Sequence, residues 1–377
     1  MSGKHGIVCM GLLMLLSSCH DDKQVTASGL QRKDFQTEVN GQYTDLFTLS
    51  NKKGMEVCIT NYGARVVSIL VPDKNGKRED VVCGFSTIGE YMEQRQNFGS
   101  TVGRYIGRIL NARFTLDGVE YKLVPNNGKS GHISHGGNPG FADRIWKVEQ
   151  ADTHRVRLSY LSPDGENGFP GNLKVTLVYS LGEDDNALDL TYEATTDAPT
   201  VLNLSHHSFF NISGNFTKSV EDQQLWVDAD RFTPYDDKKC VTGEYLPVAG
   251  TPLDFRMPHT IGECIDADHP QLKVVNGYDH TWELNTKGDD TRPAAWVYDP
   301  TSGRKMEIFT TEPGIQIYTG NGLKGKMTGK GGIAYPFRSA VCFETMHFQD
   351  SPNQPGFPST VLRPGEVFRS HTVYKFE

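Results

Sequence analysis

The sequence of 377 residues lacks several features that would assign it to common classes of protein. Its seven cysteines include no Cys-x-x-Cys pair, which argues against a disulfide framework or a zinc site and leaves open one isolated bridge. Acidic residues outnumber basic ones, 46 to 38, so the net charge is −8 and we expect no nucleic-acid partner. The chain also has no nucleotide-binding motif, no repeat of fixed period and no long run of helical periodicity.

The apolar run near the N-terminus is short. Residues 7–16 are too few to span a bilayer as an ordinary helix, and they are typical of an export signal. The run ends in "LSSC", which resembles a bacterial lipobox and implies cleavage before Cys19 and lipidation of its thiol. We therefore expect a signal peptide over residues 1–18, a polar tether over residues 19–34, and an exported protein that is lipid-anchored to the bacterial cell envelope. A plain secretory signal is the alternative.

From about Phe35 onward the sequence alternates between apolar and polar residues over short stretches bounded by turn residues. The sequences "DKNG" at residues 73–76 and "DG" at residues 117–118 predict hairpin turns. The best candidate for a helix is short, over residues 87–96. The pattern predicts one all-β domain over residues 35–377, a large antiparallel β-sandwich of two twisted sheets.

Polar side chains within the predicted strands are the candidates for a functional site, because a polar group on a buried sheet face is unfavourable unless a ligand or water meets it. His206 and His207 are adjacent, so on a strand they point to opposite faces and only one can enter a given cavity. Glu344 interrupts an apolar strand, where the alternative reading is a carboxylate paired with an arginine. Each of these residues alone is more often structural than catalytic.

Four further segments carry candidate residues. They are "GRYIGRI" with Arg104 and Arg108, "SHGG" with His135 and His132 nearby, "NGYDHTWEL" with Asp279, and "EPGIQIYTGN" with Gln316. An isolated arginine, loop histidine or acid of this kind is usually an ordinary surface or packing residue. The segments gain weight only when they are taken together.

The ordered set of motifs resembles the aldose 1-epimerase (galactose mutarotase) family from about Leu46 to Phe376. The motifs are "NYGARVVSILVPD", "GRYIGRI", "SHGG", "GFADRIWKV", "HHSFFNISG", "EPGIQIYTGN" and "FPSTVLRPGE". The resemblance implies a galactose mutarotase-like supersandwich that interconverts the α and β anomers of free hexoses, such as galactose and glucose, by acid–base ring opening. It implies that Glu344 is the base at the anomeric hydroxyl and that His207 is the acid at the ring oxygen. His206 then faces away, with a packing or backbone hydrogen-bond role.

The resemblance also implies which residues bind the sugar. Arg108, His135, Asp279 and Gln316 match the positions that bind substrate hydroxyls in the family. At rest we expect an ionised glutamate and a protonated histidine, since a nearby carboxylate favours the imidazolium. No cofactor is required and no metal is predicted, although a structural cation is compatible with the sequence. The expected partners are an aldose and, through the lipid, a membrane; the sequence leaves monomer and dimer open.

Several positions depart from the family pattern. These are Gly107 in place of asparagine, Ser134 in place of leucine, Phe209 in place of tyrosine, Met346 in place of glutamine, and Gln349-Asp350 in place of Pro-Asp. None of them removes an acid or a base. Gly107 implies the loss of one hydroxyl contact, so the changes leave the preferred sugar open.

Three other functions are compatible with parts of this pattern. A noncatalytic carbohydrate-binding protein could use the same scaffold, although binding alone needs no acid–base pair. An epimerase for phosphorylated or acidic sugars would need a basic pocket, which the acidic composition does not favour. A glycosidase could use Glu344 and Asp279 as paired carboxylates.

Overall fold

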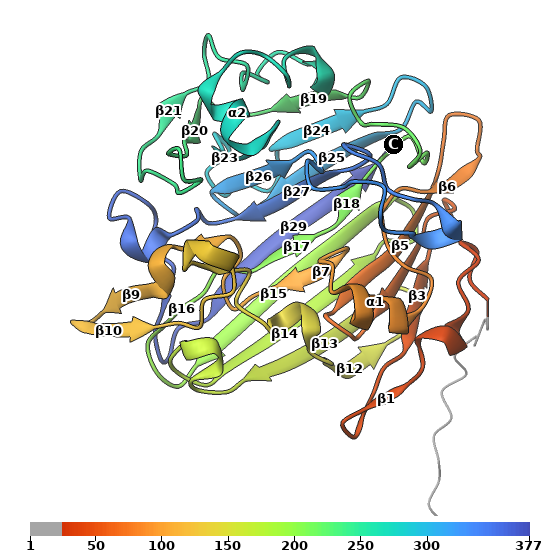
Figure 1. Ribbon diagram of the computed structural model, residues 1–377. Coiled ribbons are helices and arrows are strands. Elements are labelled where there is room, and N and C mark those ends of the chain that lie inside the picture. The colour runs from red at the N-terminus through yellow and green to blue at the C-terminus, as the bar shows by residue number, and fades with distance from the viewer. Residues whose placement is uncertain (1–24) are drawn as a thin grey trace, which may run out of the picture.

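The computed structural model describes residues 25–377, so the predicted signal peptide and Cys19 lie outside the described residues. In that part of the chain, strands dominate and the two α-helices are short, α1 (Ile88–Gln94) and α2 (Pro270–Val275). Every pairing between named strands is antiparallel. The predicted all-β antiparallel fold is therefore confirmed (Figure 1).

Three sheets make up most of the molecule. The largest has nine strands, in the order β12 (Lys147–Ala151), β13 (Arg155–Ser162), β14 (Leu173–Leu181), β15 (Ala187–Thr196), β29 (Phe368–Phe376), β25 (Lys305–Thr310), β24 (Ala295–Tyr298), β19 (Gln224–Val227) and β22 (His259–Thr260). The second has six strands, in the order β18 (Phe209–Phe210), β27 (Val341–Met346), β26 (Gly314–Tyr318), β23 (Asp279–Glu283), β20 (Arg231–Thr233) and β21 (Leu246–Pro247). The third has four strands, in the order β3 (Leu46–Ser50), β4 (Glu56–Thr60), β5 (Arg65–Pro72) and β6 (Arg78–Asp80).

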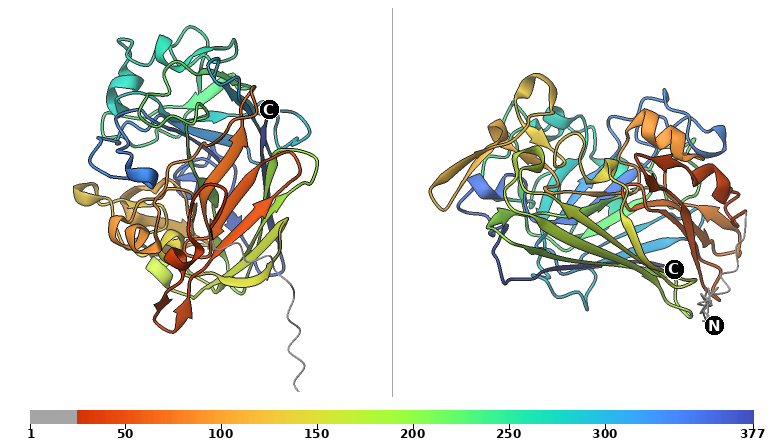
Figure 2. Two further views of the ribbon diagram at one scale, coloured as in Figure 1. Left: turned by 90° about the vertical axis from the view of Figure 1, so that its right-hand side faces the viewer. Right: turned by 90° about the horizontal axis from the view of Figure 1, so that it is seen from below.

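Short two-stranded pairs complete the fold. They are β17 (Ser205–His207) with β7 (Ser100–Val102), β11 (Ile133–Ser134) with β8 (Arg108–Ile109), β10 (Val119–Lys122) with β9 (Arg113–Leu116), β16 (Thr200–Val201) with β28 (Val361–Leu362), and β1 (Glu38–Val39) with β2 (Gln42–Tyr43). Seen from below, the β9–β10 hairpin and α1 lie on the same side of the large sheet (Figure 2).

The main core lies where the three sheets meet. One cluster of buried side chains joins Val57 of the four-stranded sheet, Leu177 of the nine-stranded sheet and Ile317 of the six-stranded sheet. Strand β15 alternates between buried and partly exposed residues, as expected when one face of a sheet packs and the other meets solvent. By contrast, β27 is buried at all six positions. Both faces of β27 are covered, which places any polar side chain on it inside the molecule.

The local predictions agree with the structure. Helix α1 begins after Thr87, whose side chain accepts the backbone N–H of Glu90, and the Glu90 carboxylate accepts the N–H of Thr87 in return. The two predicted hairpin turns connect β5 to β6 and β9 to β10. The five cysteines of the described residues, Cys58, Cys83, Cys240, Cys264 and Cys342, are all free, so the isolated bridge left open by the sequence does not form among them.

The segment from Val25 to Asp34 differs from the expected tether because it packs against the domain. The backbone N–H groups of Ala27 and Ser28 donate to the buried carboxylate of Glu56, at 3.0 and 3.1 Å. The Leu30 side chain is buried in a cluster with Phe35. Since Glu56 needs these two donors inside the protein, the folded domain begins at or before Val25 and not at Phe35. Among residues 25–377, no helix has the length and apolar character needed to cross a membrane.

Candidate active site

One cavity of about 260 Å³ brings together all six side chains that were predicted to act on a sugar. It is lined by Gln96, Asn97, Gly107, Arg108, Ser134, His135, His207, Phe209, Asp279, Gln316, Tyr318, Glu344, Met346 and Gln349. Sites for small molecules usually measure roughly 300 to 1,000 Å³, so this cavity suits a small ligand. Its polar lining suits a ligand that is rich in hydroxyl groups.

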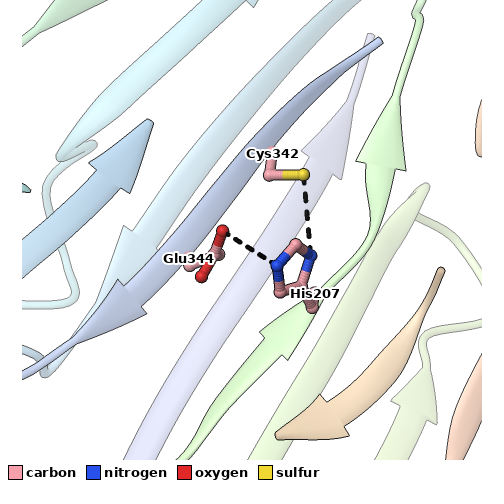
Figure 3. A group of neighbouring side chains, drawn as sticks. All are labelled: His207, Cys342 and Glu344. Atoms are coloured by element: carbon pink, nitrogen blue, oxygen red, sulfur yellow. Dashed lines mark hydrogen bonds and ion pairs between the residues drawn. The ribbon is translucent and has the colours of Figure 1, made fainter. Parts of the chain in front are cut away.

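The predicted acid and base lie side by side on neighbouring strands. Glu344 is on β27, and His207 ends β17, directly before β18, which pairs with β27. The distance from His207 Nε2 to Glu344 Oε1 is 3.4 Å, and the two residues are only 6% and 3% exposed (Figure 3). The two groups are therefore close enough to act on two oxygens bonded to the same carbon.

His206 points to the opposite face, as strand parity predicted. Its ring packs between those of Tyr179 and Tyr374, and its Nε2 forms a 2.6 Å hydrogen bond with the hydroxyl of Ser208. The packing role is confirmed, but the hydrogen-bond partner is a side chain and not the backbone. Burial lowers the pKa of His206 to about 3, so the ring is neutral at physiological pH. Of the two adjacent histidines, only His207 lines the cavity.

Two polar side chains extend the site along the six-stranded sheet. Gln316 on β26 lies directly opposite Glu344 in the strand register. Its Nε2 donates to Asp279 Oδ1 at 2.6 Å, and Asp279 is the first residue of β23. The Gln316–Asp279 bond orients both side chains, so that a carboxylate and an amide face the ligand from neighbouring strands.

The opposite wall comes from the paired strands β8 and β11, on which Arg108 lies opposite Ser134. The next residue, His135, has a φ of +52°, and its N–H donates to the carbonyl oxygen of Gly107 at 2.9 Å. This backbone turn places the His135 ring 5.4 Å from that of His207, edge to face. The Nδ1 of His135 is buried without a hydrogen-bond partner, which makes it a candidate to bind a ligand.

The Gln349 side chain occupies the space beside Gly107, where the family pattern has an asparagine that contacts a substrate hydroxyl. A side chain at position 107 would meet the Gln349 side chain, because an added Cβ would lie only 2.5 Å from Gln349 Cγ. The Gln349 amide donates to the hydroxyl of Tyr235 at 2.7 Å and accepts the backbone N–H of Arg108 at 3.3 Å. A side-chain amide therefore lines this part of the cavity, as an asparagine at position 107 would. It comes from the segment after β27 and not from the residue before β8.

The pKa shifts are opposite to those expected from the sequence. Burial raises the pKa of Glu344 well above its usual value, and the nearby negative charge of the Asp279 carboxylate adds to this rise. Burial and the neighbouring ring of His135 lower the pKa of His207 well below its usual value. Both shifts favour the neutral acid and the neutral imidazole over the expected charged pair, because removing the two groups from water disfavours their charged forms.

Burial also shifts the pKa values of His135 and Asp279. The pKa of His135 falls to about 4, because of burial and then the positive charge of Arg108. Burial raises the pKa of Asp279, although Arg108 and the hydrogen bond from Gln316 oppose this rise. His135 can therefore offer one hydrogen-bond donor and one acceptor to a ligand, but not a charge.

Some candidates from the sequence lie outside the cavity, and some lining residues were not predicted. The Arg104 guanidinium is buried and donates to the backbone carbonyls of Pro170 and Gly171, and His132 bonds to Cys240 Sγ at 3.2 Å. Gln96 and Asn97, just after α1, line the cavity without any signal in the sequence. Cys342 was also missed as a neighbour of His207, although its place two residues before Glu344 puts it on the same face of β27.

Taken together, the fold and the cavity define an acid–base enzyme of the antiparallel β-sandwich class, with a small, hydroxyl-binding site. The family model "Aldose 1-epimerase" matches residues 45–375 of the chain. The chain belongs to the aldose 1-epimerase family.

Relatives from animals and bacteria cover most of the chain. It is 40% identical over 323 residues to the galactose mutarotase of Bos taurus, and the matched region covers 85% of this chain and 91% of that protein. It is 36% identical over 339 residues to the aldose 1-epimerase of Escherichia coli strain K12, and the matched region covers 89% of this chain and 96% of that protein.

Solved structures show the same architecture. An aldose epimerase homologue from C. elegans superposes with a TM-score of 0.81 at 31% identity, over 89% of this chain and 99% of that chain. A galactose 1-epimerase from Lactobacillus acidophilus superposes with a TM-score of 0.78 at 28% identity, over 91% of this chain and 97% of that chain. The galactose mutarotase-like fold is confirmed by these neighbours.

Proposed function

We propose that this protein is an aldose 1-epimerase that interconverts the α and β anomers of free hexoses such as galactose and glucose. The observation that carries this proposal is the buried Glu344–His207 pair, 3.4 Å apart, in a cavity that also holds Arg108, His135, Asp279 and Gln316. A protein that only binds sugar has no need of a buried acid beside a buried base, since each group is unfavourable to bury unless it has a use.

The geometry suits ring opening at the anomeric carbon. Glu344 takes the proton of the C1 hydroxyl while His207 gives a proton to the ring oxygen, and the C1–ring oxygen bond breaks to leave an aldehyde. After rotation about the C1–C2 bond, His207 takes the proton back from the attacking hydroxyl while Glu344 returns its proton to the carbonyl oxygen, and the ring closes on the other face of C1. Both oxygens are bonded to C1, so one adjacent pair of side chains can reach both of them.

The pair carries a single exchangeable proton in every step of this scheme. A carboxylate with an imidazolium is ready to open the ring, and a carboxylic acid with a neutral imidazole is ready to close it. The neutral pair that burial favours is therefore the closing state, and ring opening requires transfer of that proton across the gap between Glu344 Oε1 and His207 Nε2.

Polarimetry tests the proposed activity directly. Freshly dissolved α-galactose and α-glucose change their optical rotation slowly without a catalyst, and the purified protein is expected to accelerate both changes. The absence of acceleration with any of a panel of free aldoses would reject the proposal. Release of reducing sugar from disaccharides would instead indicate a glycosidase, and heat of binding without any change in rotation rate would indicate a binding protein.

The rate of mutarotation is expected to have a bell-shaped dependence on pH. At low pH the neutral His207 ring is protonated, so the pair holds two protons and no base remains. Because the pKa of His207 is lowered, this fall in activity occurs below the ordinary histidine pKa of 6.5. At high pH Glu344 loses the shared proton, so no acid remains. Because the pKa of Glu344 is raised, this fall in activity occurs above the ordinary glutamate pKa of 4.5. Progress curves from pH 3 to 10, corrected for the uncatalysed rate, measure both limbs; an activity that only rises or only falls over this range would contradict the scheme.

We also propose that the protein is exported and anchored by lipid at Cys19, on the basis of the short apolar run and the "LSSC" sequence. In a bacterial host, the full chain is expected in the membrane fraction with an acyl mass on Cys19, and Cys19→Ser is expected to lose both. Mutarotation should be unchanged in Cys19→Ser, since residues 96–349 form the cavity. Cys264→Ser, at another cysteine, is the matched control and should keep the lipid; an unmodified wild-type chain would refute the anchor.

A further inference from the structure

Each ring nitrogen of His207 has its own partner. Nε2 faces Glu344 Oε1 at 3.4 Å, and Nδ1 lies 3.6 Å from the sulfur of Cys342 (Figure 3). Cys342 and Glu344 are two residues apart on β27, so both side chains reach the same face of the strand. Cys342 is fully buried, and within residues 25–377 its thiol has no other hydrogen-bond partner than His207.

We infer that Cys342 is a positioning residue: its sulfur accepts the Nδ1–H of His207 and thereby makes Nε2 the nitrogen that gives and takes the proton. This inference rests on the proposed function, because it concerns the same acid. A neutral imidazole carries one hydrogen, on either nitrogen, and the other nitrogen is then an acceptor. For Nε2 to exchange a proton with the sugar or with Glu344, Nδ1 must keep its hydrogen in both states of the ring.

A hydrogen held on Nδ1 needs an acceptor inside the protein, because His207 is only 6% exposed and an unpaired buried donor is unfavourable. The Cys342 sulfur is the side-chain acceptor that the structure provides at Nδ1, in addition to a backbone hydrogen bond within His207 itself. It is a weak and uncharged one, since burial raises the pKa of the thiol well above its usual value and keeps it protonated. A carboxylate in this place would hold the imidazolium in its charged form; a thiol fixes the orientation of the ring but leaves Nε2 free to release its proton.

The surroundings hold the ring in the same orientation. The imidazole stacks on Phe209 with 5.1 Å between ring centroids, and Phe209 lies opposite Cys342 in the register of β18 and β27. The stacking fixes the plane of the ring, and the sulfur fixes which edge of the ring points to Glu344. The register of two strands therefore determines both.

His207, Cys342 and Glu344 are also close enough to be considered as a metal site, since their ligating atoms lie within 4.8 Å of one another. The covalent structure of the ring argues for positioning instead. Cys342 is on Nδ1 and Glu344 is on Nε2, so the carbon between the two nitrogens lies between the two partners. An ion on the lone pair of one nitrogen would therefore face the partner of that nitrogen and point away from the partner of the other.

The test combines a tautomer measurement with kinetics. In protein labelled with ¹⁵N-histidine, the His207 signals, identified by their loss in His207→Asn, are expected to show hydrogen on Nδ1 in the wild type. Cys342→Ala should shift the ring to a mixture of the two tautomers and lower kcat by about tenfold, as expected for the loss of one modest hydrogen bond, with little change in KM. Cys342→Ser keeps an acceptor and should restore the Nδ1–H tautomer and most of the rate.

Cys58→Ala is the matched control, because it also removes a fully buried thiol, one whose partners are Ser28 and Glu56 and not His207. It should leave the tautomer and kcat of the wild type intact. A Cys342→Ala protein with the wild-type tautomer and kcat would overturn the inference, as would hydrogen on Nε2 alone in the wild type. The proposed function fails on a different observation, the lack of mutarotation by the wild type, whereas the tautomer is measured without any substrate.

Discussion

Glu344→Gln is expected to reduce kcat for mutarotation by on the order of 10² to 10⁴, the range lost when a positioned acid or base is removed. Glutamine has nearly the shape of protonated glutamic acid, so it fits the buried position on β27. It cannot take the proton of the C1 hydroxyl, however, and it cannot supply the proton that closes the ring. The affinity for the sugar should change little, because Asp279, Gln316 and Arg108 remain in the cavity. Polarimetry gives kcat, and calorimetry with the sugar gives the affinity.

Glu312→Gln is a matched control within the same chain. Glu312 is also a buried glutamate beside a histidine, 2.6 Å from Nδ1 of His347, but neither of these two residues lines the cavity. The same chemical change is therefore made in a second Glu–His pair, in which the glutamate is buried and the histidine is partly exposed. Glu312→Gln is expected to lower thermal stability and leave kcat near the wild-type value. Equal losses of activity in the two variants would show that the effect at Glu344 is one of folding, and full activity in Glu344→Gln would exclude Glu344 as the base.

Much of the fold could be predicted because local patterns determine it. The alternation along residues 154–196 reflects strands with one face on the core, and the burial of β15 follows this alternation. Thr87 and Glu90 form a capping box that begins the only helix predicted. The segment from Val25 to Asp34 was assigned to a tether because its composition is polar; it packs because a distant residue, Glu56, needs its N–H groups, and no local pattern reports such a need.

The candidate site was predictable where strand parity or a motif fixes a side chain. Parity separated His206 from His207, and the family resemblance supplied six site residues, all of which line the cavity. Features that depend on contacts between distant segments could not be read in this way. Gln349 fills the space beside Gly107 across the cavity, and burial shifts the pKa values of Glu344 and His207 against the charges expected from the sequence.

His207→Asn is expected to have an effect of the same order as Glu344→Gln, a reduction of kcat by about 10² to 10⁴. Asparagine can still donate a hydrogen bond to the ring oxygen, but it cannot transfer a proton to it, so the bond between C1 and that oxygen would have to break with charge left on the sugar. His347→Asn changes the partly exposed histidine of the Glu312–His347 pair and is the control, expected to keep kcat near the wild-type value. A fully active His207→Asn would assign the acid to another group, and His135 is the nearest candidate, with its ring 5.4 Å away.

The double variant Glu344→Gln/His207→Asn discriminates between two groups that act in one proton cycle and two that act independently. Independent groups would multiply their losses. Because Glu344 and His207 hand the same proton through one cycle, removal of either already stops it, and the double variant should be little slower than the slower single variant. A rate in the double variant that equals the product of both losses would mean that the 3.4 Å contact between Oε1 and Nε2 has no part in catalysis, and that each group reacts with the sugar separately.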